Sequence, residues 1–349
     1  MNTALHRANW AVIGEKLLPA IAYGDAAGLP FEGQPPVGGI AELRPDHANP
    51  IFAGPAGMWS DDTQLSAAVM RALITAGGFD LDAIAHEHVA QLAATPTVRR
   101  GGTIIVRGWG NSTVTAVARY HHGTRADQCG TPGGAGNGVL MKLAPLVYWQ
   151  HMAAMSSDSV VEQWDALTQF THGSDAARIC TRVHGDILMF ILGGGQPEDL
   201  ADVATESAIR HESALGAAES VSERLGVLAG LRRAGGEARL RNLTTRIGAG
   251  GQLYGFYAPE TLVCVYGAFI LWAAKPELAD TVYAAVSLGG DTDTVASIVA
   301  AMMVFRHGHS LVLPADYRRL TQIDELEFLS EQFAAAACGP ASCSGAGDR

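Results

Sequence analysis

The chain has 349 residues, of which 48% are hydrophobic and 17% charged, so it is expected to bury a large core and not to be disordered. Its formal net charge is −11 and its pI is about 5.5. An acidic chain of this kind argues against binding to a nucleic-acid backbone or to an anionic membrane.

The N-terminal segment carries Glu15 and Lys16 where a signal peptide would be apolar. The longest apolar run, 261–274, lies between Glu260 and Lys275 and is too short to span a bilayer. The five cysteines are scattered and form no CxxC pair, which argues against a disulfide framework or a zinc ribbon. We expect a cytoplasmic protein with no membrane partner.

Apolar residues recur at helical spacing along most of the chain, beginning with Trp10, Ile13 and Leu17. Glycine, proline and capping residues divide this pattern into separate helices. The segment 31–59 is rich in proline and glycine and is predicted to be a long functional loop. The predicted helices are 8–26, 60–73, 80–94, 112–121, 137–150, 158–171, 174–192, 197–234 with a break near Gly216, 259–274, 277–287, 292–306 and 316–336.

No stretch keeps the alternation of apolar and polar residues that a half-buried strand requires. The chain is therefore predicted to be all-α, with a single domain over 1–337 and a flexible Gly/Ser-rich tail over 338–349. The 41 glycines predict closely packed helices and turns that come close to a ligand.

Two short acidic turns each open an apolar helix: 60–63 (SDDT) and 289–294 (GGDTDT). An aspartate at a helix start is usually a cap, but each helix needs one cap and each turn has two aspartates. If the turns converge, four carboxylates would repel one another unless cations neutralise them. Carboxylate and hydroxyl oxygens suit Mg²⁺, Mn²⁺ or Ca²⁺. We therefore predict that the two turns meet and share a pair of divalent cations.

A third segment, 24–32 (GDAAGLPFE), ends the first predicted helix and begins the long loop with Glu32. A lone glutamate on a loop is usually a solvated surface group. Asp25 near a helix C-terminus is electrostatically misplaced, because the helix dipole disfavours an anion there. We expect Asp25 to bond nearby backbone and to take no part in the chemistry.

The glycine-rich segment 133–138 (GGAGNG) leads into a predicted helix. It resembles a dinucleotide fingerprint only superficially, because no strand precedes it. Backbone N–H groups at such a helix start can hold a phosphate, and the alternative is a flexible turn between helices. Asn137 and Lys142 would add polar groups nearby.

His172 lies between two predicted helices, in the segment 171–173 (THG). A histidine at a helix end is more often a structural hydrogen-bonding group than a ligand or a base. His86 and His88 are two positions apart on a predicted helix, so they face different ways and do not match the HExxH metal spacing.

In chain order, these segments resemble the ADP-ribosylglycohydrolase family. The resemblance covers roughly residues 8–335 and rests on GDAAGLPFE, SDDTQL, the GNGxxMKxAP segment, the Thr171–His172 pair and GGDTDTVAS. Each segment alone is weak evidence for the family, but five segments in the family's order are specific to it. The resemblance implies a compact orthogonal bundle of helices with two Mg²⁺ ions, or Mn²⁺ ions, in a cleft.

The resemblance also implies roles for individual residues. The metal ligands would be Ser60, Asp61, Asp62, Asp291, Asp293 and Thr294, with Asp293 bridging the two ions. Glu32 would lie beside the metals as the catalytic carboxylate, together with Asp62. The substrate-binding residues would be Gly110, Asn111, Ser112, Gly136, Asn137, Gly138 and His172, of which the glycine loop 136–138 would hold the pyrophosphate.

Two positions depart from the family pattern. Ser60 stands where threonine is usual and keeps the hydroxyl, so metal binding should survive. Lys142 replaces a common arginine, which would weaken any bidentate contact at that point.

The implied reaction is hydrolysis of the bond at ribose C1″, which frees ADP-ribose from a modified acceptor. The acceptor would be a protein carrying ADP-ribosyl-arginine or -serine, or a related small ADP-ribosyl compound. Metals would orient the ribose hydroxyls and activate water, and Glu32 would act as general acid or base.

Two alternatives stay open. One is an all-α metal-dependent nucleotide phosphohydrolase, which usually takes ligands from a His-Asp dipeptide. None of the twelve histidines is followed by aspartate, which counts against it. The other is a non-catalytic member of the family that binds ADP-ribose. Fold resemblance does not guarantee activity, but the retained aspartates and Glu32 disfavour this alternative.

Overall fold

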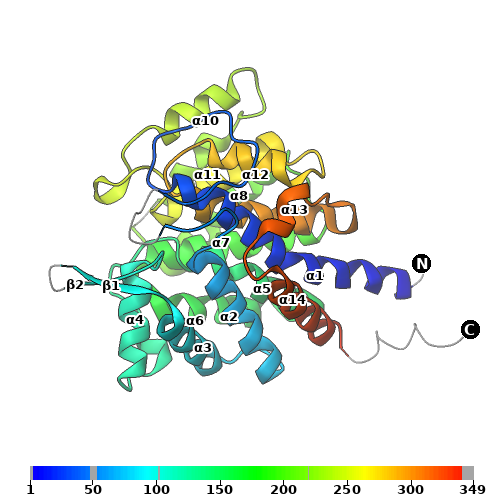
Figure 1. Cartoon of the computed structure of the whole chain (residues 1–349). Helices are drawn as coiled ribbons and strands as arrows, with labels where there is room; N and C mark the ends of the chain where they lie inside the picture. The colour runs from blue at the N-terminus through cyan, green and yellow to red at the C-terminus, as the bar shows by residue number, and fades with distance from the viewer. Residues whose placement is uncertain (1–2, 48–52, 101–102, 219, 340–349) are drawn as a thin grey trace, which may run out of the picture.

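The computed structural model describes residues 3–47, 53–100, 103–218 and 220–339, most of which are helical (Figure 1). The longer elements are α1 (Thr3–Gly28), α2 (Asp61–Ala76), α3 (Leu81–Ala94), β1 (Thr97–Arg100), β2 (Thr103–Val106), α4 (Asn111–His121), α5 (Leu143–Met152), α6 (Ser157–Thr171), α7 (Asp175–Leu192), α8 (Leu200–Leu215), α9 (Val221–Leu225), α10 (Gly236–Thr244), α11 (Ala258–Trp272), α12 (Leu278–Val286), α13 (Thr292–His307) and α14 (Ile323–Cys338). The all-α prediction is confirmed, with one small hairpin added.

Helix α13 is the element around which the others pack. Its residues from Thr292 to Phe305 are all buried, as expected for a helix that is apolar on every side. Helices α1, α2, α7, α11 and α12 contact it, and Figure 1 shows these helices running in several directions. The buried start of α13 therefore places the GGDTDT turn at the centre of the molecule.

Two glycines let α1 approach α13 closely. Gly24 and Gly28 lie one turn apart on the same face of α1. A Cβ atom at Gly24 would lie 2.3 Å from the carbonyl oxygen of Ala296, and one at Gly28 would lie 2.3 Å from that of Thr292. The Thr292 hydroxyl also donates to the Gly28 carbonyl at 2.8 Å. This close backbone contact brings the end of α1 to the first turn of α13.

We expect Gly24→Ala to lower the free energy of unfolding by about 1–3 kcal/mol, because the added methyl group must push two backbones apart. Chemical denaturation measures this change. Gly226→Ala is the control, since a Cβ atom there meets nothing within 4 Å and its φ of −56° is ordinary. The control is expected to change stability by less than about 0.5 kcal/mol. Equal effects in both variants would contradict the close contact.

The β1–β2 hairpin is a feature that the sequence patterns did not predict. Its two antiparallel strands have four residues each, and β2 (TIIV) ends in three successive apolar residues without alternation. Such a short run carries no period-two signal. The hairpin leads directly to Gly108 and to the start of α4.

Three predicted helices are interrupted or preceded by a separate turn in the structure, while the others differ only in where they begin and end. The predicted helix 197–234 breaks at Gly216 as expected, but only α9 follows, and α10 begins at Gly236 after glycines with positive φ at 230 and 235. The predicted helices 137–150 and 316–336 each open with a separate 3-10 turn, before α5 and α14. Helix α14 runs to Cys338, so the predicted tail begins as helix, and residues 340–349 lie outside the described part.

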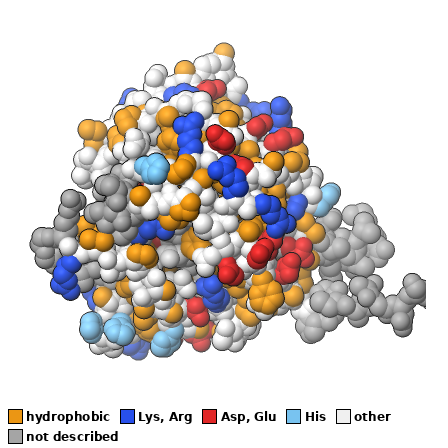
Figure 2. Space-filling view, in the orientation of Figure 1, with side chains coloured by type: hydrophobic (Ala, Val, Ile, Leu, Met, Phe, Trp, Pro, Cys, Tyr) orange, Lys and Arg blue, Asp and Glu red, His pale blue; other side chains and the backbone are white. Residues whose placement is uncertain are grey.

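The surface of the described residues carries both signs of charge. On the face shown in Figure 2, Lys and Arg side chains are interspersed with Asp and Glu and form no continuous basic patch. Across the part of the chain that the structure covers, no helix is both long enough and apolar enough to cross a bilayer.

Candidate active site

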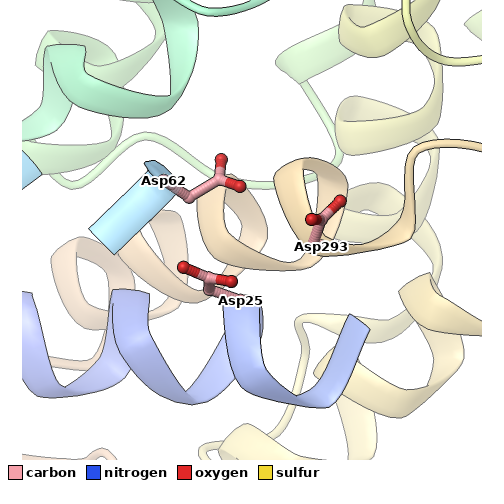
Figure 3. Close-up of side chains that lie close together, drawn as sticks. All are labelled: Asp25, Asp62 and Asp293. Carbon is pink, nitrogen blue, oxygen red and sulfur yellow. The ribbon is translucent and has the colours of Figure 1, made fainter. Parts of the chain in front are cut away.

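The two acidic turns meet at the junction of α1, α2 and α13. Carboxylate oxygens of Asp25, Asp62 and Asp293 lie within 4.8 Å of one another and point toward a shared space (Figure 3). Oxygens of Glu32, Asp291 and Asp293 form a second group within the same limit. Asp62 comes from the first turn and Asp293 from the second, so the predicted meeting of the two turns is confirmed; Asp293 belongs to both groups.

Asp25 holds the first turn of α2 in place. Its carboxylate accepts hydrogen bonds from the backbone N–H of Ser60 at 2.8 Å, from the backbone N–H of Thr63 at 3.0 Å and from the Thr63 hydroxyl at 2.6 Å. These N–H groups have no partner within their own helix, so a side chain of α1 caps α2. Asp25 therefore bonds backbone, as predicted, but the backbone belongs to a distant helix. Asp25 also lies within the acidic group, which its position near a helix C-terminus did not indicate.

Hydroxyl groups from both turns converge on Asp62. Its carboxylate accepts hydrogen bonds from Ser60 at 3.2 Å, from Thr294 at 3.3 Å and from Ser297 at 3.1 Å. Ser297 was not among the residues singled out from the sequence, although it lies one turn after Thr294. Asp62 is only 1% exposed, and these three donors fix its orientation.

Asp291 is not used as a cap. It occupies the N-cap position of α13, yet its side chain makes no capping hydrogen bond. Instead it accepts a hydrogen bond of 2.6 Å from the amide of Asn137, which also donates to the Gly255 carbonyl at 3.2 Å. The second acid in the turn is therefore surplus to capping, and Asn137 orients it.

Backbone pairing holds Glu32 beside this turn. The Gly33 N–H donates to the Gly290 carbonyl at 2.8 Å, and the Gly290 N–H donates to the Gln34 carbonyl at 2.9 Å. Gly290 has a φ of +79°, and a Cβ atom there would lie 1.8 Å from the Tyr254 carbonyl oxygen. Only glycine fits this position, and its pairing places Glu32 next to Asp291.

Burial and mutual repulsion raise the pKa of the clustered carboxyl groups. Burial is the main cause for Asp25, whose pKa is raised to about 6, and for Asp61, whose pKa is raised to about 8. Burial likewise raises the pKa of Asp62, Asp291 and Asp293, whereas the charge of Asp293 is the main cause of the raised pKa of Glu32. Divalent cations would relieve this repulsion, and all the donors are hard oxygens, so the residues fit Mg²⁺ or Mn²⁺.

Metal binding is expected to stabilise the protein more at high pH. Because the pKa of Asp61 rises from near 4 to about 8, the folded, metal-free chain binds more protons than the unfolded chain between these values. Its stability must therefore fall as the pH rises through this range. We expect saturating Mg²⁺ or Mn²⁺ to raise the thermal unfolding midpoint more at pH 8 than at pH 5.5, against EDTA with matched ionic strength. An equal rise at both pH values would contradict the clustered carboxylates.

The acidic cluster opens into a pocket of about 380 Å³, a size typical of ligand sites. The predicted site residues among its lining are Glu32, Asp61, Gly110, Asn111, Ser112, Gly136, Asn137, Gly138, His172, Asp291, Asp293 and Thr294. Ser60 and Asp62 are buried and are not among the lining residues, but Asp62 contacts Thr294, which is. A larger depression of about 490 Å³ lies along α10, but its described lining includes no carboxylate, so the chemistry favours the acidic pocket.

Sequence patterns missed several residues that line the pocket. Thr113 directly follows the predicted segment 110–112, and Met141 follows the glycine loop. Gln252 and Phe256 come from the glycine-rich connection before α11. The same signal as in 133–138, a glycine loop before a helix start, could have identified this connection.

His172 is buried and neutral. Its Nδ1 lies 2.8 Å from the Thr171 hydroxyl, and burial lowers its pKa to about 3. A Cβ atom at Gly138 would lie 3.3 Å from the His172 ring, so the glycine loop packs directly on it. This arrangement leaves an uncharged ring at the pocket wall.

Lys142 does not supply the polar reach predicted for it. It is fully buried, and its Nζ donates to Nε2 of His88 at 3.1 Å, while Nδ1 of His88 donates to the Ile84 carbonyl at 2.8 Å. Burial lowers the pKa of Lys142 to about 7, and the charge of Asp61 acts in the opposite direction. In its charged form, this buried lysine opposes the rise in the pKa of Asp61.

Comparisons with known proteins agree with this fold. A solved structure described as an ADP-ribosylglycohydrolase-related protein complex is 22% identical, with a TM-score of 0.67, and the match covers 95% of this chain and 99% of that chain. At this identity the likeness shows the fold alone. A comparison with curated proteins found no match. The family model for ADP-ribosylglycohydrolases matches residues 16–342, so the chain belongs to the ADP-ribosylglycohydrolase family.

Proposed function

We propose that this protein is a metal-dependent hydrolase that cleaves the glycosidic bond at ribose C1″ and releases ADP-ribose. The acceptor would be an arginine- or serine-modified protein, or a related small ADP-ribosyl compound. The observation that carries the proposal is the pair of buried carboxylate groups that share Asp293 and open into the pocket.

The proposed ligands of two Mg²⁺ ions, or Mn²⁺ ions, are Ser60, Asp61, Asp62, Asp291, Asp293 and Thr294. Asp25 joins them by position, because its oxygens lie with those of Asp62 and Asp293. When bound, the ions would orient the ribose hydroxyls and lower the pKa of a water molecule. Metal affinity would depend on Asn137 and Ser297, which orient Asp291 and Asp62.

The pocket would have to bind an anionic ligand without the help of basic side chains. Its described lining includes no Lys or Arg. The charge of a pyrophosphate would therefore meet backbone N–H groups of the glycine loop and of the start of α4, besides the bound cations. Helix α4 suits this role, because its N-cap residue is Gly110, which has no side chain to cap the N–H groups of the first turn.

Glu32 would move the proton in the reaction. The charge of Asp293 raises its pKa, which brings a carboxyl group closer to the range in which it can both hold and accept a proton. As general acid it would protonate the leaving group at C1″; as general base it would take a proton from the attacking water. Backbone pairing to Gly290 keeps it at the cluster for either role.

A substrate panel tests the proposal. Arginine-, serine- and base-linked ADP-ribose would be incubated with the protein and Mg²⁺, Mn²⁺ or EDTA, and the products read by mass. We expect free ADP-ribose from one class of linkage, and none in EDTA. Release of inorganic phosphate would support the phosphohydrolase alternative, and binding of ADP-ribose without hydrolysis would support a non-catalytic member.

A further inference from the structure

A loop before α11, here called the pocket loop (residues 247–256), reaches the pocket from a part of the chain that carries none of the proposed metal ligands. Its ends pair through Ile247 and Leu253, and its Gln252 and Phe256 line the pocket. Gly250, Gly251 and Gly255 in this loop have positive φ, so the backbone alone does not favour a single shape. Something outside the loop must fix its position.

Glu260 is the side chain that holds the pocket loop. It lies in the first turn of α11 and is only 3% exposed. Its carboxylate accepts hydrogen bonds from the backbone N–H of Ala249 at 3.2 Å and from that of Gly255 at 3.3 Å. Arg224 lies 4.0 Å from the same carboxylate and provides a counter-charge. A Cβ atom at Gly248 would lie 2.1 Å from its Oε2, so the loop fits closely around it.

The other side of the Gly255 peptide is held as well. Its carbonyl oxygen accepts hydrogen bonds from the Thr261 hydroxyl at 2.5 Å and from the Asn137 amide at 3.2 Å. Phe256 is the next residue along the chain. Its place in the pocket thus follows from a peptide fixed by Glu260 on one side and by Thr261 and Asn137 on the other.

We propose that Glu260 is a positioning residue for substrate binding: by holding the pocket loop, it places Gln252 and Phe256 against the bound substrate. The inference rests on the proposed function, since it takes ADP-ribose as the ligand. It assigns Glu260 an effect on binding, with little effect on the chemical step or on the metal ions.

The experiment compares Glu260→Ala and Glu260→Gln with a control, Asp186→Asn. Asp186 is also a structural acid, bonded to Ser207, Arg210 and His211, but it belongs to the α7–α8 contact. Calorimetry measures the Kd for ADP-ribose and for Mn²⁺, and initial rates give KM and kcat. We expect Glu260→Ala to raise Kd and KM about tenfold and Glu260→Gln about threefold, because glutamine keeps one acceptor oxygen. The Mn²⁺ affinity and kcat should change by less than about threefold.

A second measurement tests the anchor without any ligand. Hydrogen exchange of peptides covering the pocket loop should be faster in Glu260→Ala than in the wild type and unchanged in the control. Unchanged exchange, unchanged Kd, or a parallel loss of Mn²⁺ affinity in Glu260→Ala would each overturn the inference. A wild-type protein that binds no ADP-ribose would instead overturn the proposed function, and the exchange result would still report on the anchor.

Discussion

Asp293→Ala is expected to abolish turnover, with kcat/KM lowered by more than about a hundredfold. Changing a group that merely supports a metal ligand typically costs about ten- to a hundredfold. Asp293 is the carboxylate common to both acidic groups, so replacing it should lower kcat/KM by more than that range. Steady-state kinetics measures kcat/KM, and a calorimetric titration measures the affinity for Mn²⁺. Both are expected to fall.

The control for Asp293 is Asp80→Ala. Asp80 is the N-cap of α3, and its carboxylate accepts a hydrogen bond from the Ala83 N–H at 2.9 Å. Its loss should lower the free energy of unfolding by about 1 kcal/mol and leave turnover unchanged. Without metal at pH 8, Asp293→Ala is expected to be more stable than the wild type, because it removes a repelling charge. An active Asp293→Ala variant with a small loss of stability would show that Asp293 is only a structural residue.

Glu32→Gln is the second change with a large expected effect. Glutamine keeps the size of the side chain but can neither give nor take the proton, so kcat should fall about a hundred- to a thousandfold. KM should change little, because the backbone pairing with Gly290 that places the side chain is kept. The pH profile of kcat is expected to lose the limb due to this carboxyl group.

Glu42→Gln provides the comparison for Glu32. Glu42 is exposed on the same long loop, so the variant makes the same chemical change outside the cluster. Its rates and pH profile should match those of the wild type. If Glu32→Gln also turned over normally, Glu32 would have no part in the mechanism.

The sequence contained the local parts of this structure. Capping residues and glycines indicate most helix starts and ends, since these depend on neighbours within a few positions. The surplus aspartates in the two turns likewise indicated a cation site, because the residue types alone suit hard metals. The hairpin was not predicted, because strands of four residues are too short to show a periodic pattern.

The missing parts depend on contacts between distant segments. Asp25 caps a helix whose N-cap residue lies 35 positions later, and nothing near Asp25 in sequence indicates that partner. Lys142 was expected to add a polar group near the ligand, but it is hydrogen-bonded to His88 in the core. Gln252 and Phe256 enter the pocket only because Glu260 folds their loop back onto α11. A pattern within one segment cannot show which other segment will satisfy its polar groups.

The pairing of Gly33 and Gln34 with Gly290 has an implication for redesign. Backbone groups make this pairing, and further along the loop Leu43 and Asp46 are buried, so the exposed positions 38, 39, 41 and 42 are the ones open to redesign. Under the proposed function, libraries that vary these four positions are expected to change the acceptor preference while Glu32 stays in place.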